Sequence, residues 1–199
     1  MSYSLKSKEN VSGGSANAKP RIDWQTPGIY ENVRISEIKY GKSAIKGSPY
    51  VQLMTIGANN EVGSSSKMYL NTVASEGKTR CAWDITAGNL ADLIVATHNI
   101  PRTEAELIDL VPDNEPDVAK QHEMLVHKLS TLLCNRPFRA KFKGEQPKEN
   151  GLVFATLDRV ETMNIPKEAS RLRFDSKYDI KMFGQEAVEA EKAKDDLPF

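Results

Sequence analysis

The C-terminal segment 186–199 has residue types suited to binding a partner rather than to building a core. It contains five carboxylates and two lysines, and its last five residues are Asp195, Asp196, Leu197, Pro198 and Phe199. Pro198 fixes the backbone angle φ, so the Phe199 ring is presented stiffly beside several carboxylates. Such a peptide fits an apolar pocket rimmed by Arg or Lys. A solvated acidic tail without a partner is the alternative interpretation.

Apart from Leu197, this tip resembles the acidic C-terminal tip of bacterial single-stranded DNA-binding proteins, which ends Asp-Asp-Ile-Pro-Phe. The resemblance implies that residues 195–199 bind replication and repair proteins. It also implies that a basic, β-rich domain with aromatic residues precedes the tail.

The charged residues are unevenly distributed, although the chain of 199 residues has a net charge of zero. Residues 19–84 contain nine basic and six acidic residues, whereas residues 92–123 contain two basic and eight acidic ones. In residues 128–181, twelve basic residues accompany seven acidic ones. A basic surface can therefore coexist with an acidic helical segment and an acidic tail, and the neutral total does not exclude nucleic-acid binding.

Cysteine and histidine usage argues against disulfide and zinc chemistry. Cys81 and Cys134 are too few for a secreted disulfide framework. The three histidines, His98, His122 and His127, lack the spacing of zinc ligands. Neither a secretion signal nor an apolar run of the roughly 18 residues that span a membrane is present. We therefore expect a cytoplasmic protein without metal, cofactor or membrane association.

Alternation of apolar and polar residues predicts five strands. The first begins at Ile29, with Ile29, Val33 and Ile35 on one side, Tyr30 and Arg34 on the other, and a bulge at Glu37 and Ile38. The second covers 50–56 and the third covers 62–71, with a hairpin turn at 58–61 between them. The fourth covers 137–143 and the fifth covers 152–160.

Between the third and fourth strands the apolar spacing becomes helical. Residues 79–97 predict a helix that 86–89 could break in two, and residues 117–133 predict a second amphipathic helix. Between these two helices, Thr103 and Glu106 predict a capping box at the start of a further helical segment. The expected organisation is a flexible arm at 1–20, one domain at 21–165 with a helical insert at about 72–136, a basic and aromatic extension at 166–185, and the acidic tail at 186–199.

Three strands, helices and two further strands follow the order of an oligonucleotide-binding (OB) barrel. We therefore predict a mainly β fold, a five-stranded OB barrel with helices inserted between strands three and four. Such barrels bind single strands through cations that contact phosphates and exposed rings that stack on bases. The candidate DNA-binding residues are Tyr30, Arg34, Lys39, Tyr40, Lys42, Lys46, Tyr50, Lys67, Tyr69, Arg139, Lys141 and Lys143.

Each of these residues also has an ordinary structural role open to it, because tyrosines line barrel walls and cations face solvent. Arg139, Lys141 and Lys143 alternate with Phe138 and Phe142, which predicts a core side and a phosphate-tracking side for the fourth strand. The basic and aromatic extension at 166–185 either packs on the barrel or a neighbouring protomer and extends the DNA path, or forms a linker.

Together, strand order, basic strand faces and the Asp195–Phe199 tip resemble a bacteriophage-type single-stranded DNA-binding protein. The resemblance implies sequence-nonspecific protection of single-stranded DNA during replication, recombination and repair, with partner proteins recruited by the tail. It implies no catalytic activity, and a location in the host cytoplasm if a phage encodes the chain. A monomer or a homodimer is expected, since the N-terminal strand and the linker of the cellular bacterial proteins are missing.

Two other function classes remain open from the sequence. An RNA-binding or strand-annealing module could use the same fold. A metal-dependent nuclease would need carboxylates that converge on a pocket. The only candidates in the sequence form one acidic group, and their spacing is that of a solvated surface. This acidic group is Glu104, Glu106, Asp109, Asp113, Glu115 and Asp117.

Overall fold

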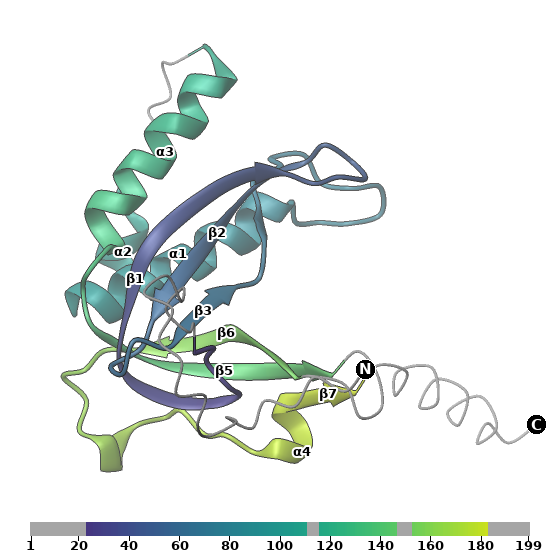
Figure 1. The fold of residues 1–199 in the computed structure, drawn as a ribbon. Coiled ribbons are helices and arrows are strands. Elements are labelled where there is room, and N and C mark those ends of the chain that lie inside the picture. Colours follow the sequence, from purple (N-terminus) through teal and green to yellow (C-terminus); the bar gives the residue numbers. More distant parts are fainter. Residues whose placement is uncertain (1–22, 111–115, 147–152, 183–199) are drawn as a thin grey trace, which may run out of the picture.

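The computed structural model describes residues 23–110, 116–146 and 153–182 (Figure 1). The strands are β1 (Gly28–Lys42), β2 (Pro49–Ile56), β3 (Val62–Ser65), β4 (Met68–Tyr69), β5 (Phe138–Gln146), β6 (Phe154–Glu161) and β7 (Ile180–Met182). The helices are α1 (Ala82–His98), α2 (Arg102–Glu106), α3 (Val118–Leu133) and α4 (Ser176–Asp179), with a 3-10 turn η1 at Lys167–Ala169. The predicted N-terminal arm and acidic tail lie outside the described residues.

The strands form one mixed sheet in the order β1-β2-β3-β6-β5-β7. Because β1 also pairs with β5, the pairings return to β1 after passing through β2, β3, β6 and β5. The pair β3–β6 is parallel and the pair β5–β7 is parallel, whereas the other strand pairs are antiparallel. Helices and strands contain similar numbers of residues, so the coarse class is a mixed sheet with helices inserted between β4 and β5.

Two irregularities allow β1 to pair with both β2 and β5. Opposite β2 the register shifts between Ile35 and Glu37, where the sequence indicated a bulge. Opposite β5 it shifts between Tyr30 and Val33, and Asn32 between them has a φ of 55°. A bulge bends its strand and increases the local twist, and β1 curves along its length in Figure 1. The second irregularity was not predicted.

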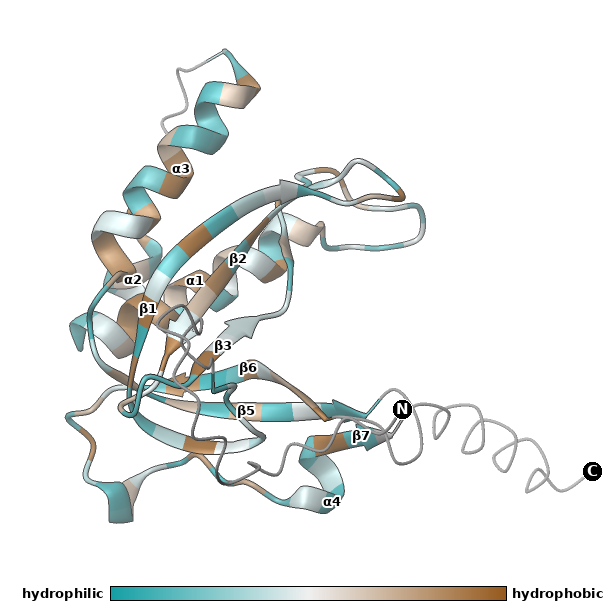
Figure 2. Ribbon diagram, viewed as in Figure 1, coloured by the Kyte–Doolittle hydropathy of each residue, from teal (hydrophilic) through white to brown (hydrophobic). Residues whose placement is uncertain are grey.

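The core lies between the inner side of the sheet and helices α1 and α3. Apolar and polar residues alternate along β1 in Figure 2, as period two requires. Side chains that are at most 2% exposed come from both sheet and helices: Val33, Ile35, Val51, Leu53, Phe138, Phe142, Leu90, Ile94, Leu125, Leu129 and Leu133. The prediction that Phe138 and Phe142 are core residues is therefore confirmed.

The helices correct two expectations from the sequence. Helix α1 is continuous through 86–89, and the buried Thr86 hydroxyl donates to the Tyr69 carbonyl at 2.7 Å. Helix α2 begins after Pro101 without a side-chain cap, so the capping box at Thr103 and Glu106 was wrong. Helix α3 begins where expected, because the Asp117 carboxylate accepts from the Ala119 backbone N–H at 2.8 Å.

The predicted third strand, 62–71, is two short strands, β3 and β4, that both pair with β2. The segment 162–182 lies along the lower side of β5 in Figure 1. Its strand β7 pairs with β5, and Ser170 and Leu172 are buried. The prediction that the extension packs on the sheet is confirmed as far as Met182.

Candidate nucleic-acid interface

The outward side of β1, β2, β3 and β4 forms one continuous surface, which we call the outer face. Along β2 the residues Val51, Leu53 and Thr55 are buried, so the residues between them point outward. The register places outward residues of β1 and of β3 or β4 beside them. The outer face consists of Arg34, Glu37, Lys39, Gly41, Tyr50, Gln52, Met54, Ile56, Val62, Ser64, Lys67 and Tyr69.

An aromatic cluster occupies the end of the outer face near the β1–β2 loop. The Tyr50 and Tyr69 rings meet edge to face, with centroids 6.0 Å apart. The Lys67 ammonium lies 4.6 Å from the centre of the Tyr50 ring. Gly41 leaves room for this ring, because a Cβ atom there would lie 2.7 Å from Tyr50 Cζ. Rings and a cation at one exposed place can bind bases and phosphate together.

Charged residues of β1 continue the outer face. Arg34 and Lys39 are exposed and lie opposite Ile56 and Gln52 of β2. Glu37 lies between them on the same side, and its carboxylate is 3.6 Å from the Lys39 ammonium. Glu37 therefore reduces the positive potential of this surface.

Two of the predicted aromatic contacts have structural roles instead. The Tyr40 hydroxyl meets Nδ1 of His122 at 3.0 Å, and their rings stack 5.0 Å apart, which joins β1 to α3 on the side opposite Tyr50. Burial, assisted by the charge of Lys42, lowers the pKa of His122. Tyr30 packs edge to face against Phe142 at 5.5 Å, and its hydroxyl accepts from the Thr26 N–H. Both were predicted to contact DNA; the structure gives each a packing contact, and Tyr40 is 40% exposed.

Tyr30 was also placed on the same side of the first strand as Arg34, but the irregularity at Asn32 changes the phase between them. Lys42 and Lys46 are exposed at the loop end of the β1–β2 ladder. Lys42 lies opposite Pro49 and thus on the Tyr40 side of the strand. Lys46 lies in the loop between β1 and β2, four positions before Tyr50.

The fourth predicted strand requires a larger correction, because its cations are enclosed by acidic residues. Arg139 is 3% exposed, and its Nε and one terminal nitrogen donate to Glu31 and Glu161, each at 2.7 Å. Lys141 is 9% exposed and contacts Asp179 at 2.7 Å and Asp158 at 3.2 Å. These two side chains hold the 162–182 segment on β5 and do not form a phosphate-tracking surface.

Lys143, the third cation of that strand, is half-buried, and its ammonium lies 3.2 Å from Asp158. One carboxylate of β6 therefore contacts both lysines of β5. Because this pairing neutralises it, we exclude Lys143 from the outer face as well.

Two carboxylates of this network, Glu161 and Asp179, have lowered pKa values. Burial acts to raise the pKa of Glu161, but donation from Ser170, the Arg171 N–H and Arg139 outweighs it. Burial also acts to raise the pKa of Asp179, but the hydrogen bonds from Lys141 and the Asp175 N–H lower this pKa by more. Hydrogen bonds and positive charges favour the ionised forms, so both groups stabilise the folded chain as carboxylates.

We expect an acid-dependent loss of stability from these two carboxylates. A lowered folded pKa contributes stability that is complete above the ordinary carboxyl pKa of about 4 and disappears as the pH falls through the folded value. Urea unfolding between pH 7 and pH 2.5 should show a decline below about pH 4, less steep in Asp179→Asn. Glu123→Gln, at an exposed position of α3, is the control. An equal acid slope in Asp179→Asn and the unaltered chain would refute this assignment.

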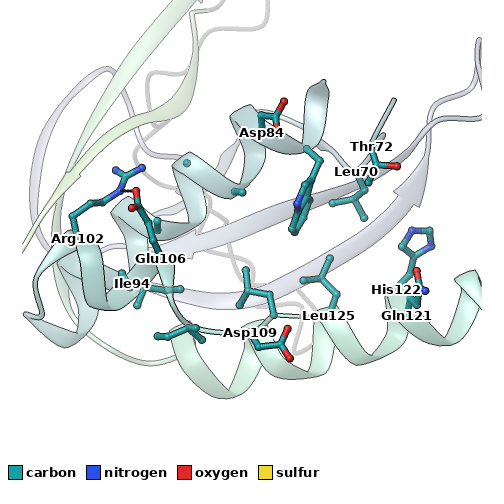
Figure 3. Close-up of a pocket in the computed structure, with 17 residues that line it drawn as sticks. Leu70, Thr72, Asp84, Ile94, Arg102, Glu106, Asp109, Gln121, His122 and Leu125 are labelled. Carbon is teal, nitrogen blue, oxygen red and sulfur yellow. Dashed lines mark hydrogen bonds and ion pairs between the residues drawn. The ribbon is translucent and has the colours of Figure 1, made fainter. Parts of the chain in front are cut away.

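A pocket of about 610 Å³ lies between α1, α2 and α3 (Figure 3). Leu70, Ile94 and Leu125 supply apolar lining, and Asp84, Glu106 and Asp109 supply carboxylates. Arg102 at its edge is paired with Asp92 and Glu106. Among the described residues, no three His, Cys, Asp or Glu side chains are arranged to hold a metal ion. Asp113 and Glu115 of the acidic group lie outside the described residues.

Comparison with protein-family models and with curated proteins finds no match to this chain. Within the described ranges, the helices are all too short or too polar to cross a membrane. The outer face thus has to be interpreted from its own chemistry. The tail residues Asp195–Phe199 lie outside the described residues, and their recruiting role stays a prediction.

Proposed function

We propose that this protein binds single-stranded DNA on the outer face and is of the bacteriophage single-stranded DNA-binding type. The observation that carries the proposal is the meeting of Tyr50, Tyr69 and Lys67 on an exposed sheet surface that continues to Lys39 and Arg34. Rings that stack on bases combined with cations that contact phosphates bind single strands with little sequence preference.

The strand connectivity supports an OB barrel as the scaffold. Strand β1 pairs with β2 and β5, β3 meets β6, and helices α1, α2 and α3 lie between β4 and β5 in the chain. In OB folds, the second and third strands and the loop after the first strand bind oligonucleotides. Here the corresponding places are β2, β3 with β4, and the loop at 43–48; β2 and β4 carry Tyr50 and Tyr69, and Lys67 lies just before β4.

The proposed role is to cover single-stranded DNA in replication, recombination or repair. Duplex DNA hides the faces of its bases, so stacking on Tyr50 and Tyr69 would favour single strands over duplexes. Nothing on the outer face chooses between deoxyribose and ribose, and an RNA arm therefore belongs in the test.

The function is tested by fluorescence anisotropy of labelled single-stranded DNA, single-stranded RNA and duplex DNA of equal length over a salt series. We expect single-stranded DNA to bind more tightly than duplex DNA, with affinity falling as salt rises because each neutralised phosphate releases counterions. Lys39→Ala should reduce the salt slope by about 0.7 for one lost phosphate contact. Glu37→Gln should tighten binding severalfold at low salt, since it removes the negative charge beside Lys39.

Lys120→Ala is the matched control, because Lys120 is exposed on α3, which contacts the opposite side of β1. It should leave affinity and slope unchanged. Tighter binding of duplex than of single strands, or an affinity independent of salt, would contradict the proposed function. Tighter binding of RNA would identify an RNA-binding module instead.

A further inference from the structure

Trp24 extends the outer face at the end away from the aromatic cluster. It precedes β1 and forms a parallel bridge with Val62 of β3. The bridge consists of the Gln25 N–H donating to the Val62 carbonyl and the Val62 N–H donating to the Asp23 carbonyl, both at 2.8 Å. The backbone of Trp24 is thus fixed, yet its side chain is 64% exposed.

The side of the sheet to which Trp24 points follows from its neighbours. Partners in a bridge point to the same side, and Val62 lies opposite Ile56, which lies opposite Arg34. The next residue, Gln25, points inward, because it is 4% exposed and accepts from the Thr55 hydroxyl at 2.9 Å. Trp24 therefore lies on the outer face, in one row with Ile56 and the exposed cation Arg34.

This row and the aromatic cluster mark the two ends of one surface. From Ile56 to Tyr50, β2 runs for six residues, or about 20 Å at about 3.3 Å per residue. Met54 and Gln52 point outward between them, and Lys39 lies alongside on β1. Within the described parts of the chain, no helix or strand packs over this stretch.

We propose that Trp24 is a second base-stacking platform and that a single strand runs along β2 from Tyr50 and Tyr69 to Trp24, with Arg34 beside the last phosphate. The inference rests on the proposed function and adds the length of its site. At about 3.4 Å per nucleotide, 20 Å corresponds to about six stacked nucleotides. Single-strand sites on one OB fold hold about 4–16 nucleotides.

Intrinsic fluorescence tests contact with the ring directly. The chain has two tryptophans, Trp24 and Trp83, and Trp83 is partly buried beside the core at the start of α1. In the full chain carrying Trp83→Phe, the emission comes from Trp24 alone. Saturating (dT)12 should quench this emission strongly, because a stacked base lies against the indole. In the chain carrying Trp24→Phe, the emission of Trp83 should change little.

Competition by oligonucleotides of two lengths tests the extent of the site. Trp24→Ala should weaken binding of (dT)12 about tenfold. It should leave binding of (dT)4 within about twofold, because four nucleotides at the stacked spacing of about 3.4 Å cover about 14 Å, less than the distance from the aromatic cluster to Trp24. Trp24→Phe, which keeps a ring, should restore most of the (dT)12 affinity. The salt slope should not change, since no charge is removed.

The outcomes distinguish a failure of this inference from a failure of the proposed function. If (dT)12 binds and Trp24 emission is not quenched, or if Trp24→Ala weakens (dT)4 and (dT)12 equally, the platform is refuted while DNA binding stands. If Trp24→Ala instead changes the sedimentation coefficient of the DNA-free protein, the exposed ring contacts a second copy of the chain, and the inference is also overturned. If neither oligonucleotide binds the unaltered chain, the proposed function itself fails.

Discussion

Arg139→Ala is expected to lower the free energy of unfolding by about 3–5 kcal/mol, the cost of breaking a buried ion pair by removing one partner. The guanidinium is almost fully enclosed and bonds Glu31 of β1, Glu161 of β6 and the Ile165 carbonyl. Its loss would leave the buried Glu161 carboxylate with less compensation. Equilibrium urea unfolding at pH 7 measures the change.

Arg136→Ala is the matched control for this loss. Arg136 is exposed just before β5, and its replacement should change the unfolding free energy by less than about 0.5 kcal/mol. DNA affinity of Arg139→Ala, measured where the variant is still folded, should stay near that of the unaltered chain. Unchanged stability with a large loss of DNA affinity would restore the phosphate-contact role that the sequence suggested.

Arg139 also illustrates where sequence reasoning reaches its limit. A cation between Phe138 and Ala140 has the period of a solvent-facing residue, and period two correctly assigned the core side of β5. Whether the other side meets water depends on residues far away in the chain. Glu31 lies 108 positions before Arg139 and Glu161 lies 22 positions after it. No local pattern indicates such pairing.

The first strand shows the same distinction between local and long-range information. The bulge near Glu37 was predictable, because the phase of the apolar residues slips within the strand itself. The change at Asn32 was not, since it follows from the need of β1 to pair with both β2 and β5. Tyr50, Lys67 and Tyr69 lie together on one side of the sheet, whereas Tyr30 packs against Phe142 of the core and Tyr40 against His122 of α3.

Helix positions were predicted well where the apolar stripe is strong. Leu125, Leu129 and Leu133 recur every four residues in α3 and are all buried. Helix caps were less predictable, because Thr103 and Glu106 fit a capping box in sequence, while the N-cap of α2 is Pro101, two residues earlier. The exposed Trp24 ring had no periodic signal, since a single bridge to Val62 positions it.

The second large effect is expected from the aromatic cluster. Tyr50→Ala or Tyr69→Ala should each weaken single-stranded DNA binding about tenfold, because base stacking on a ring contributes roughly 1–3 kcal/mol. The double variant should lose about a hundredfold in affinity if the two effects add. The edge-to-face contact between the rings is the source of any departure from that sum. The salt slope should stay the same, since stacking neutralises no phosphate. Anisotropy titrations over a salt series provide both quantities.

Gly41→Ala tests whether binding depends on the position of the Tyr50 ring and not only on its presence. The new methyl group would lie 2.7 Å from Tyr50 Cζ, so the ring must move aside while the residue remains. Affinity should fall severalfold with little loss of stability, because the displaced ring is at the surface. Tyr178→Ala is the control, since Tyr178 is 73% exposed on α4 and outside the outer face. If Tyr178→Ala weakens binding as much as Tyr50→Ala, or if Gly41→Ala and Tyr50→Ala both leave it unchanged, the strand does not stack on this cluster.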